Sequence, residues 1–216
     1  MRRATRRRVT RWLLRISAAA VLSAAPFYLL VRGALLARST WGWHAWLAVA
    51  FGALLAALAI SAVAWWMLRR LAIERSFRAI ATRVALPLVG AFCAFSLLYL
   101  SASNAKSLEI REAYARLHPI LRLAVGTVRL VDTRLMVTDI ERIPISYAAM
   151  QLARPVHSLH YAQDDGTVHA LDLRTGGRGA LRNGLVRLYF EVLGFETLRH
   201  VGTADHLHVR LPEVQS

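Results

Sequence analysis

The sequence contains one cysteine, Cys93, and one lysine, Lys106, among its 216 residues. A single cysteine excludes a disulfide framework and a thiolate metal site, so we interpret Cys93 as a small apolar packing residue. Acids are also scarce in one half of the chain. Residues 1–108 contain 15 Lys+Arg and one acid, Glu74, whereas residues 109–216 contain 13 Arg and 12 acids. The N-terminal half therefore carries almost all of the formal net charge of +15.

That N-terminal half is also much more apolar than a soluble domain. The whole chain is 56% hydrophobic, with a mean hydropathy of +0.38, and long apolar runs lie at residues 16–37, 41–68 and 84–102. The run 41–68 would measure about 42 Å as a helix, against a hydrocarbon core of about 30 Å. Tryptophans near its ends fit interfacial aromatic belts. The sequence predicts a membrane domain over residues 16–102 with three transmembrane helices, preceded by a basic segment at residues 1–15.

The arginines predict the orientation in the lipid bilayer. They crowd into residues 2–15 and 69–83, whereas the turn 38–44 is nearly bare of charge. The positive-inside rule then places the N-terminus in the cytoplasm and residues 103–216 on the outer face of a cell (inner) membrane, periplasmic or extracellular. An alternative is that the first run is a cleaved signal peptide.

The same distribution argues against nucleic acid as a partner. The arginines flank apolar runs and do not form a basic surface interleaved with aromatic side chains. A basic membrane protein that binds nucleic acid or anionic lipid through its arginine-rich start remains an alternative, but it explains nothing about the histidines described below.

Residues 103–216 predict a small α+β domain of antiparallel strands and helices. Asn104 is expected to cap a helix over about 105–117, and a helix over 180–194 is expected to stop at Gly194. A short helix is expected near 145–153. Strands are expected at 120–132, 134–140, on both sides of a turn within 156–174, and in a final segment that carries 200-HVGTADHLHVRLP-212.

Seven of the eight histidines lie in this domain, at positions 118, 157, 160, 169, 200, 206 and 208. His206 and His208 stand two apart on a predicted strand, so both point to the same face and can address one ligand. We interpret His118 as a loop residue and His157 as an exposed one. A second concentration of potential ligands comprises His157, His160, His169 and Asp172.

The length of the hairpin loop determines which of these residues point to the same face of the sheet. If residues 164–166 form a three-residue loop, His160 and Asp172 share a face and His169 points away. A two-residue turn would instead place His160 and Asp172 on opposite faces. With the longer loop, His160, Asp172 and His208 make an N, O, N set, which is a three-ligand zinc site with one open position for water.

The segments 158-SLH-160, 169-HALDL-173 and 205-DHLHVRLP-212 resemble the LAS metallopeptidases, a group of D-alanyl-D-alanine carboxypeptidases, lysostaphin-type enzymes and murein endopeptidases. The likeness covers roughly residues 135–212 and is closest to the penicillin-insensitive murein endopeptidases. It implies that His160, Asp172 and His208 hold zinc, that His206 is the catalytic histidine and that Ser158 supports the first ligand.

The resemblance also implies hydrolysis of a peptide bond in peptidoglycan (cell-wall) peptides. Arg142 becomes a candidate for binding the substrate, and Asp205 a candidate for orienting His206 or His200. The chain departs from the family pattern in one respect: His160 and Asp172 stand twelve positions apart, where the family has seven. The longer spacing leaves His169 as a rival first ligand. It also leaves open a non-catalytic protein, derived from such a peptidase, that binds zinc or a wall peptide.

Overall fold

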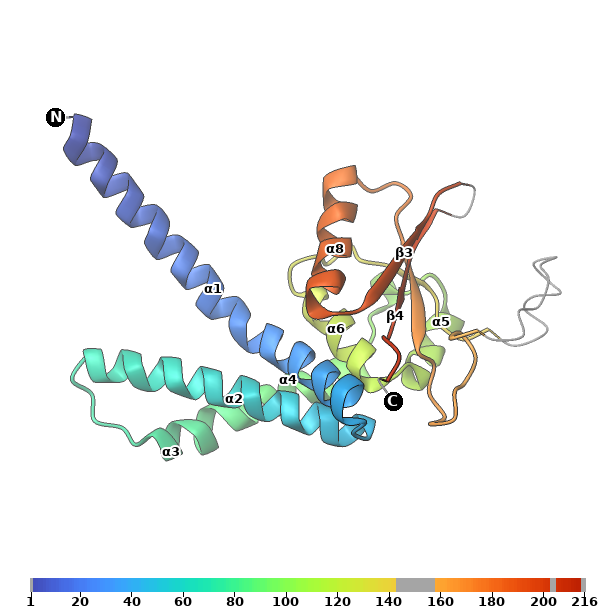
Figure 1. Cartoon of the computed structure of the whole chain (residues 1–216), viewed down its shortest axis with the longest axis horizontal. Coiled ribbons are helices and arrows are strands. Elements are labelled where there is room, and N and C mark those ends of the chain that lie inside the picture. The colour runs from blue at the N-terminus through green and yellow to red at the C-terminus, as the bar shows by residue number, and fades with distance from the viewer. Residues whose placement is uncertain (1, 143–157, 203–204, 215–216) are drawn as a thin grey trace.

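Three apolar helices form the N-terminal half of the chain. The computed structural model describes residues 2–142, 158–202 and 205–214 (Figure 1). Among these residues, three helices are long and apolar enough to cross a membrane. The first is Trp12–Trp41, which lies within α1 (Arg2–Trp41), and the second is α2 (Ala45–Arg70). The third, Phe77–Leu98, is a continuous helix that combines α3 (Phe77–Ile80), a π-helical turn (Ala81–Ala85) and α4 (Leu86–Leu98). The three predicted spans are confirmed as apolar helices. The third begins earlier than predicted and ends at Leu98, because the backbone at Tyr99 is extended.

Close backbone contact joins α1 to α2. A Cβ atom on Gly52 would lie 2.1 Å from the carbonyl oxygen of Leu30, so only glycine fits at this crossing. Many other apolar side chains on the three helices are exposed; they include Leu47, Leu54, Leu58, Leu88, Phe95 and Leu98. Apolar surface of this extent on helices of spanning length is satisfied by lipid, so the protein is membrane-associated.

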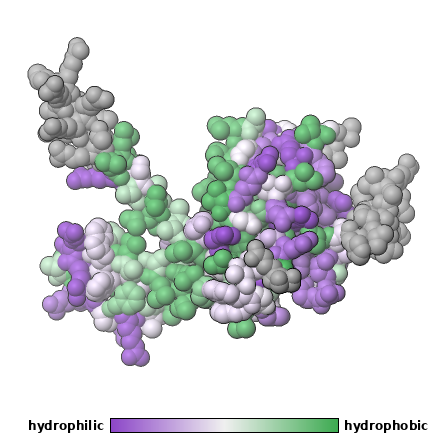
Figure 2. Space-filling model, viewed as in Figure 1, coloured by the Kyte–Doolittle hydropathy of each residue, from purple (hydrophilic) through white to green (hydrophobic). Residues whose placement is uncertain are grey.

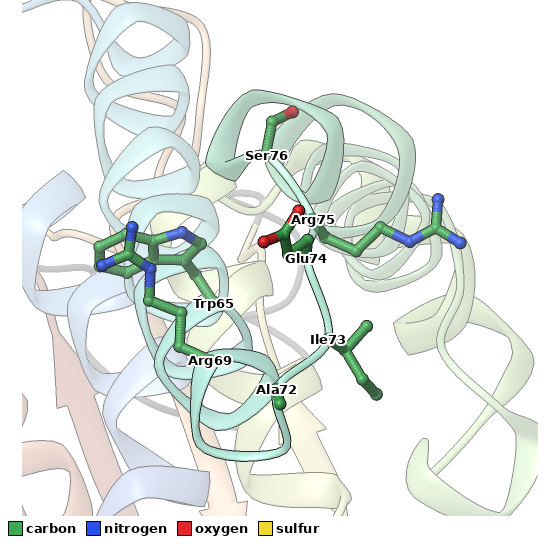
Figure 3. Close-up of a pocket in the computed structure, with 7 residues that line it drawn as sticks. All are labelled: Trp65, Arg69, Ala72, Ile73, Glu74, Arg75 and Ser76. Atoms are coloured by element: carbon green, nitrogen blue, oxygen red, sulfur yellow. The ribbon is translucent and has the colours of Figure 1, made fainter.

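Arginine and tryptophan mark the end of α2 that lies farthest from the sheet. Figure 3 shows Arg69 over the ring of Trp65, at 4.3 Å from the ring centroid, while Arg75 points away. These residues and the loop 72–76 line a pocket of about 610 Å³. Arginine stacked on an interfacial tryptophan fits the boundary between lipid and water.

The C-terminal half is the expected mixture of helices and an antiparallel sheet. Its helices are α5 (Leu108–Ala113), α6 (Pro119–Arg129) and α8 (Ala180–Leu193), with short 3-10 turns at Ala102–Asn104 and Tyr114–Arg116. Its strands are β1 (Val137–Asp139), β2 (Ala170–Arg174), β3 (Glu196–His200) and β4 (His206–Arg210). The sheet order is β1-β2-β4-β3, and every neighbouring pair is antiparallel. The α+β fold class is therefore correct.

The strand predicted at 120–132 is wrong, because this segment forms α6. His118 caps the helix: its Nδ1 accepts a hydrogen bond from the backbone N–H of Ile120 at 3.2 Å. Pro119 follows at the first helical position, where its missing N–H costs nothing. Residues 119–128 are all buried. A helical spacing was present, since Leu121, Ala124, Val125 and Val128 recur at i, i+3, i+4 and i+7, but the run is short and mostly apolar and was interpreted as a strand.

Other boundaries also differ from the predictions. The cap of α5 is Ser107, whose hydroxyl accepts from the N–H of Ile110, whereas Asn104 donates to the carbonyls of Thr133 and Leu135. The first strand predicted within 156–174 is reduced to a single bridge between Ala162 and Val168. The helix predicted near 145–153 lies outside the described residues, as does His157. The predicted stop at Gly194 is confirmed, since this residue ends α8 with φ +96°.

The two halves share one hydrophobic core, which runs from Leu30 in α1 to Leu211 after β4. Side chains of one half also bind backbone carbonyls of the other. Arg32 donates to the carbonyl of Leu193 at 3.2 Å, at the C-terminal end of α8, where a cation is favoured. Arg122 donates to the carbonyl of Leu97 at 2.7 Å. The α+β half is thus packed directly on the three helices.

Candidate metal centre

The pairing of β2 with β4 brings two predicted ligands together. In this pairing Asp172 lies opposite His208, and Arg174 lies opposite His206. Burial alternates along β4, with Leu207 and Val209 in the core and both histidines on the other face. The prediction that His206 and His208 share a face is confirmed.

A second segment brings the third predicted ligand, His160, to the same place. The N–H of Gln163 donates to the carbonyl of Thr167 at 2.9 Å, and Gly166 has φ +73°. This is the predicted three-residue loop with a left-handed glycine. His160 itself lies in a turn, in which the N–H of Tyr161 donates to the carbonyl of Ser158 at 3.1 Å, and not on a strand paired with β2. The hydroxyl of Ser158 accepts from the N–H of His160 at 3.2 Å, so the predicted supporting serine lies in contact with that residue.

The candidate ligand atoms converge on one point. His160 Nε2 lies 3.2 Å from His208 Nδ1 and 3.5 Å from Asp172 Oδ1, and His208 Nδ1 lies 2.8 Å from Asp172 Oδ1. A tetrahedral ion with bonds of about 2.0–2.1 Å requires its ligand atoms to be about 3.3 Å apart. The spacing of the three atoms therefore fits a tetrahedral cation that has one further position open.

Hydrogen bonding fixes the tautomer that a ligand needs. His160 Nδ1 lies 2.6 Å from the carbonyl oxygen of Ile140. A carbonyl only accepts, so Nδ1 carries the proton and the lone pair of the neutral ring is on Nε2, among the other ligand atoms. This arrangement is typical of a metal-ligating histidine.

Arg142 orients the carboxylate of the set. Its Nη2 donates to Asp172 Oδ2 at 2.8 Å, and its Nε donates to Asp139 Oδ2 at 2.5 Å. Burial by itself raises the pKa of Asp172, but hydrogen bonds with His160 and His208 outweigh it, so the pKa lies well below its usual range. Asp172 is therefore an anion at neutral pH, with Oδ2 held by Arg142 and Oδ1 left facing the histidines.

His206 lies beside the ligand set. Its Nε2 is 3.6 Å from Asp172 Oδ2, and its ring stacks on that of His200, with centroids 4.6 Å apart. The carboxylate of Asp205 binds the guanidinium of Arg199 at 2.7–2.9 Å. The structure thus places His200, which had no predicted role, against the candidate catalytic histidine.

An open cleft of about 790 Å³ adjoins Asp172 and His206. Besides the predicted Arg142 and Asp205, it is lined by residues that sequence reasoning missed, among them Lys106, Asp139 and Arg174. Asp139 could have been identified from its position opposite Asp172 in the sheet, but that position is apparent only when the register of β1 with β2 is known. Lys106 is the only lysine in the sequence, which gave a weaker indication that it has a functional role.

His169, the rival first ligand, belongs to a different cluster. Its Nε2 lies 2.8 Å from Asp165 Oδ2, and the ring of His118 lies edge-on to it. Arg38 faces His169 Nδ1 at 3.5 Å, so Nδ1 accepts and Nε2 carries the proton. The same reasoning applies to His118, whose Nδ1 accepts from Ile120. Both rings thus present N–H groups to Asp165, and this cluster lacks the free lone pairs that a metal requires.

His118 is expected to make the protein acid-sensitive. Burial, followed by the charge of Arg38, lowers its pKa to about 3, whereas an unfolded histidine has a pKa of about 6.5. Between these values the unfolded chain binds more protons, so stability falls as the pH drops through this window. In His118→Asn the side chain still accepts from Ile120 but does not titrate. We expect the melting temperature of this variant to fall less between pH 7 and pH 5 than that of the wild type.

The matched control is His44→Asn, because His44 also caps a helix through Nδ1 but is exposed. Thermal unfolding of the full chain in detergent, measured at both pH values, provides the comparison. A pH dependence of His118→Asn equal to that of the wild type and the control would contradict the assignment.

Comparison with protein-family models, curated proteins and solved structures finds no match to this chain.

Proposed function

We propose that the protein is a membrane-anchored, zinc-dependent peptidase that hydrolyses peptide bonds in peptidoglycan peptides. The observation that carries the proposal is the convergence of His160 Nε2, Asp172 Oδ1 and His208 Nδ1, at 2.8–3.5 Å from one another. Two imidazoles and one carboxylate are a common zinc-hydrolase ligand set, and three protein ligands leave a position for water.

The remaining residues supply the functions that such a reaction needs. Zinc bound here would polarise a peptide carbonyl and lower the pKa of a water molecule. His206, on the same strand face as His208, accepts the proton of the attacking water and returns it to the leaving amine. Arg142 keeps Asp172 oriented through Oδ2.

Charge in the cleft agrees with a wall-peptide substrate. Lys106 and Arg174 line the cleft beside Asp172, and their cations suit the free carboxylates that such peptides carry, whereas Arg142 is paired with Asp139 and Asp172. The predicted topology supports the same substrate, because the positive-inside rule would keep the arginine-rich segments 2–15 and 69–83 in the cytoplasm and leave the cleft on the outer side.

The test is metal content and peptide hydrolysis of the purified full chain in detergent, with isolated wall peptides as substrate. One zinc per chain together with cleavage is the expected result. Zinc without cleavage of any wall fragment would favour the non-catalytic binding protein. A folded chain that binds no metal would overturn the proposal.

A further inference from the structure

α8 exposes an apolar stripe. Leu181, Leu185, Leu188 and Val192, at helical spacing, have exposed fractions of 78%, 56%, 53% and 56%. The side of α8 that packs on the core is formed instead by Val186, Phe190 and Leu193. A helix in water does not expose four large apolar side chains in a row without a partner.

The stripe continues into a groove between α8 and α1. Leu185, Leu188 and Val192 form one wall of this groove, which has a volume of about 620 Å³, and α1 residues from Ala20 to Tyr28 form the other. The end of α6 adds Leu130 and Val131. The α1 wall lies within the candidate span Trp12–Trp41. A groove with one wall made by a membrane span opens into the same hydrocarbon that surrounds the span.

The direction of α8 agrees with this location. In Figure 1, α8 runs across the direction of α2, as a helix lying in the plane of a bilayer does relative to a spanning helix. Figure 2 shows hydrophobic surface on the edge of the α+β half next to α1, and mostly hydrophilic surface on the opposite edge. Arg187 and Glu191, which pair on another side of α8, give the helix its polar face.

We propose that α8 is an interfacial membrane helix: its stripe is buried in the leaflet next to the α+β half, and lipid acyl chains fill the groove between α8 and α1. The bonds from Arg32 to Leu193 and from Arg122 to Leu97 hold the α+β half against the spans in this position. The inference does not depend on peptidase activity.

The experiment places nitroxide spin labels on single cysteines in the full chain, in a Cys93→Ala background. Labels replace Leu185 and Leu188 in the stripe and, as matched control, Arg187 on the polar face of the same helix. The protein is reconstituted in nanodiscs of phosphatidylethanolamine and phosphatidylglycerol. Collision of each label with oxygen, which concentrates in lipid, and with a water-soluble nickel chelate is then measured.

The expected result is a ratio of oxygen to nickel collisions several-fold higher at positions 185 and 188 than at 187. Equal ratios at the three positions would overturn the proposal. So would dipolar coupling between labels on different chains together with protection from both agents, because the stripe would then be covered by a second copy. As a second measurement, a bimane fluorophore at position 188 should be quenched by chain-labelled doxyl lipids much more strongly than one at 187.

Discussion

Replacing His208 with alanine is expected to remove the bound metal and the hydrolysis of wall peptides together, whereas His206→Ala is expected to remove hydrolysis and leave the metal in place. The two residues lie on the same face of β4, but only His208 places a nitrogen among the converging ligand atoms. Loss of a proton acceptor typically lowers turnover by about 10²–10⁴-fold. Zinc content and kcat of the two variants, measured on the full chain, make the comparison.

His169→Ala is the control for this pair, because His169 belongs to the cluster with Asp165 and lies outside the ligand set. It should retain both metal and activity. If His206→Ala loses metal as completely as His208→Ala, the division between ligand and proton acceptor is wrong. If His169→Ala loses metal while His160→Ala retains it, the first ligand has been misassigned.

Asp132→Ala is expected to destabilise the α+β half by about 3 kcal/mol, a typical loss when one member of a buried ion pair is removed. Asp132 follows α6, and its buried carboxylate binds the guanidinium groups of Arg178 and Arg182. The side chain of Arg178 is only 8% exposed, so the variant leaves a buried cation without its counter-ion. Denaturant unfolding, with hydrogen exchange followed in α8, measures the change in free energy.

The control for Asp132 is Glu191→Ala, which removes an exposed pair with Arg187 and should cost less than about 1 kcal/mol. The effect at Asp132 should also depend on pH. Burial raises the pKa of this carboxyl, but hydrogen bonds from Arg182 and Arg178 outweigh it, so the folded-state pKa is lowered. The stabilisation is therefore present above the unfolded pKa of about 3.9 and is lost as the pH falls through the folded value. Equal losses for the two variants would contradict this account.

Short sequence patterns predicted the residues of the candidate site more accurately than they predicted the surrounding fold. The shared face of His206 and His208 followed from the two-residue period of a strand, and the three-residue loop ending at Gly166 followed from its residues, although His160 reaches Asp172 from a turn and not from a paired strand. Both are properties of short segments, in which a few backbone angles decide the outcome. The three spans were recognisable because hydrocarbon imposes a composition that no water-exposed helix has.

The surroundings of the site depend on tertiary contacts that a single sequence does not reveal. α6 is buried among the spans and α8, and its short apolar run did not by itself distinguish a buried helix from a buried strand. The guanidinium of Arg142 was expected to contact the substrate, but the structure holds it between Asp139 and Asp172, a position that depends on the register of β1 with β2. The exposed apolar stripe of α8 follows a helical period, but which side of the helix faces the core depends on its packing.

The shared core also has a consequence for how the chain is made. Protein synthesis runs from the N-terminus, so α1, α2 and α4 emerge before α6 packs against them, with Gly126 so close to Ser96 that a Cβ would lie 2.3 Å from its hydroxyl. The strands that bring Asp172 to His208 join residues 36 positions apart, so we expect them to pair after the helices have formed. We therefore expect membrane insertion to provide the surface on which the candidate metal centre forms. A chain that is not inserted would lack that surface, and we expect its candidate site to remain unformed.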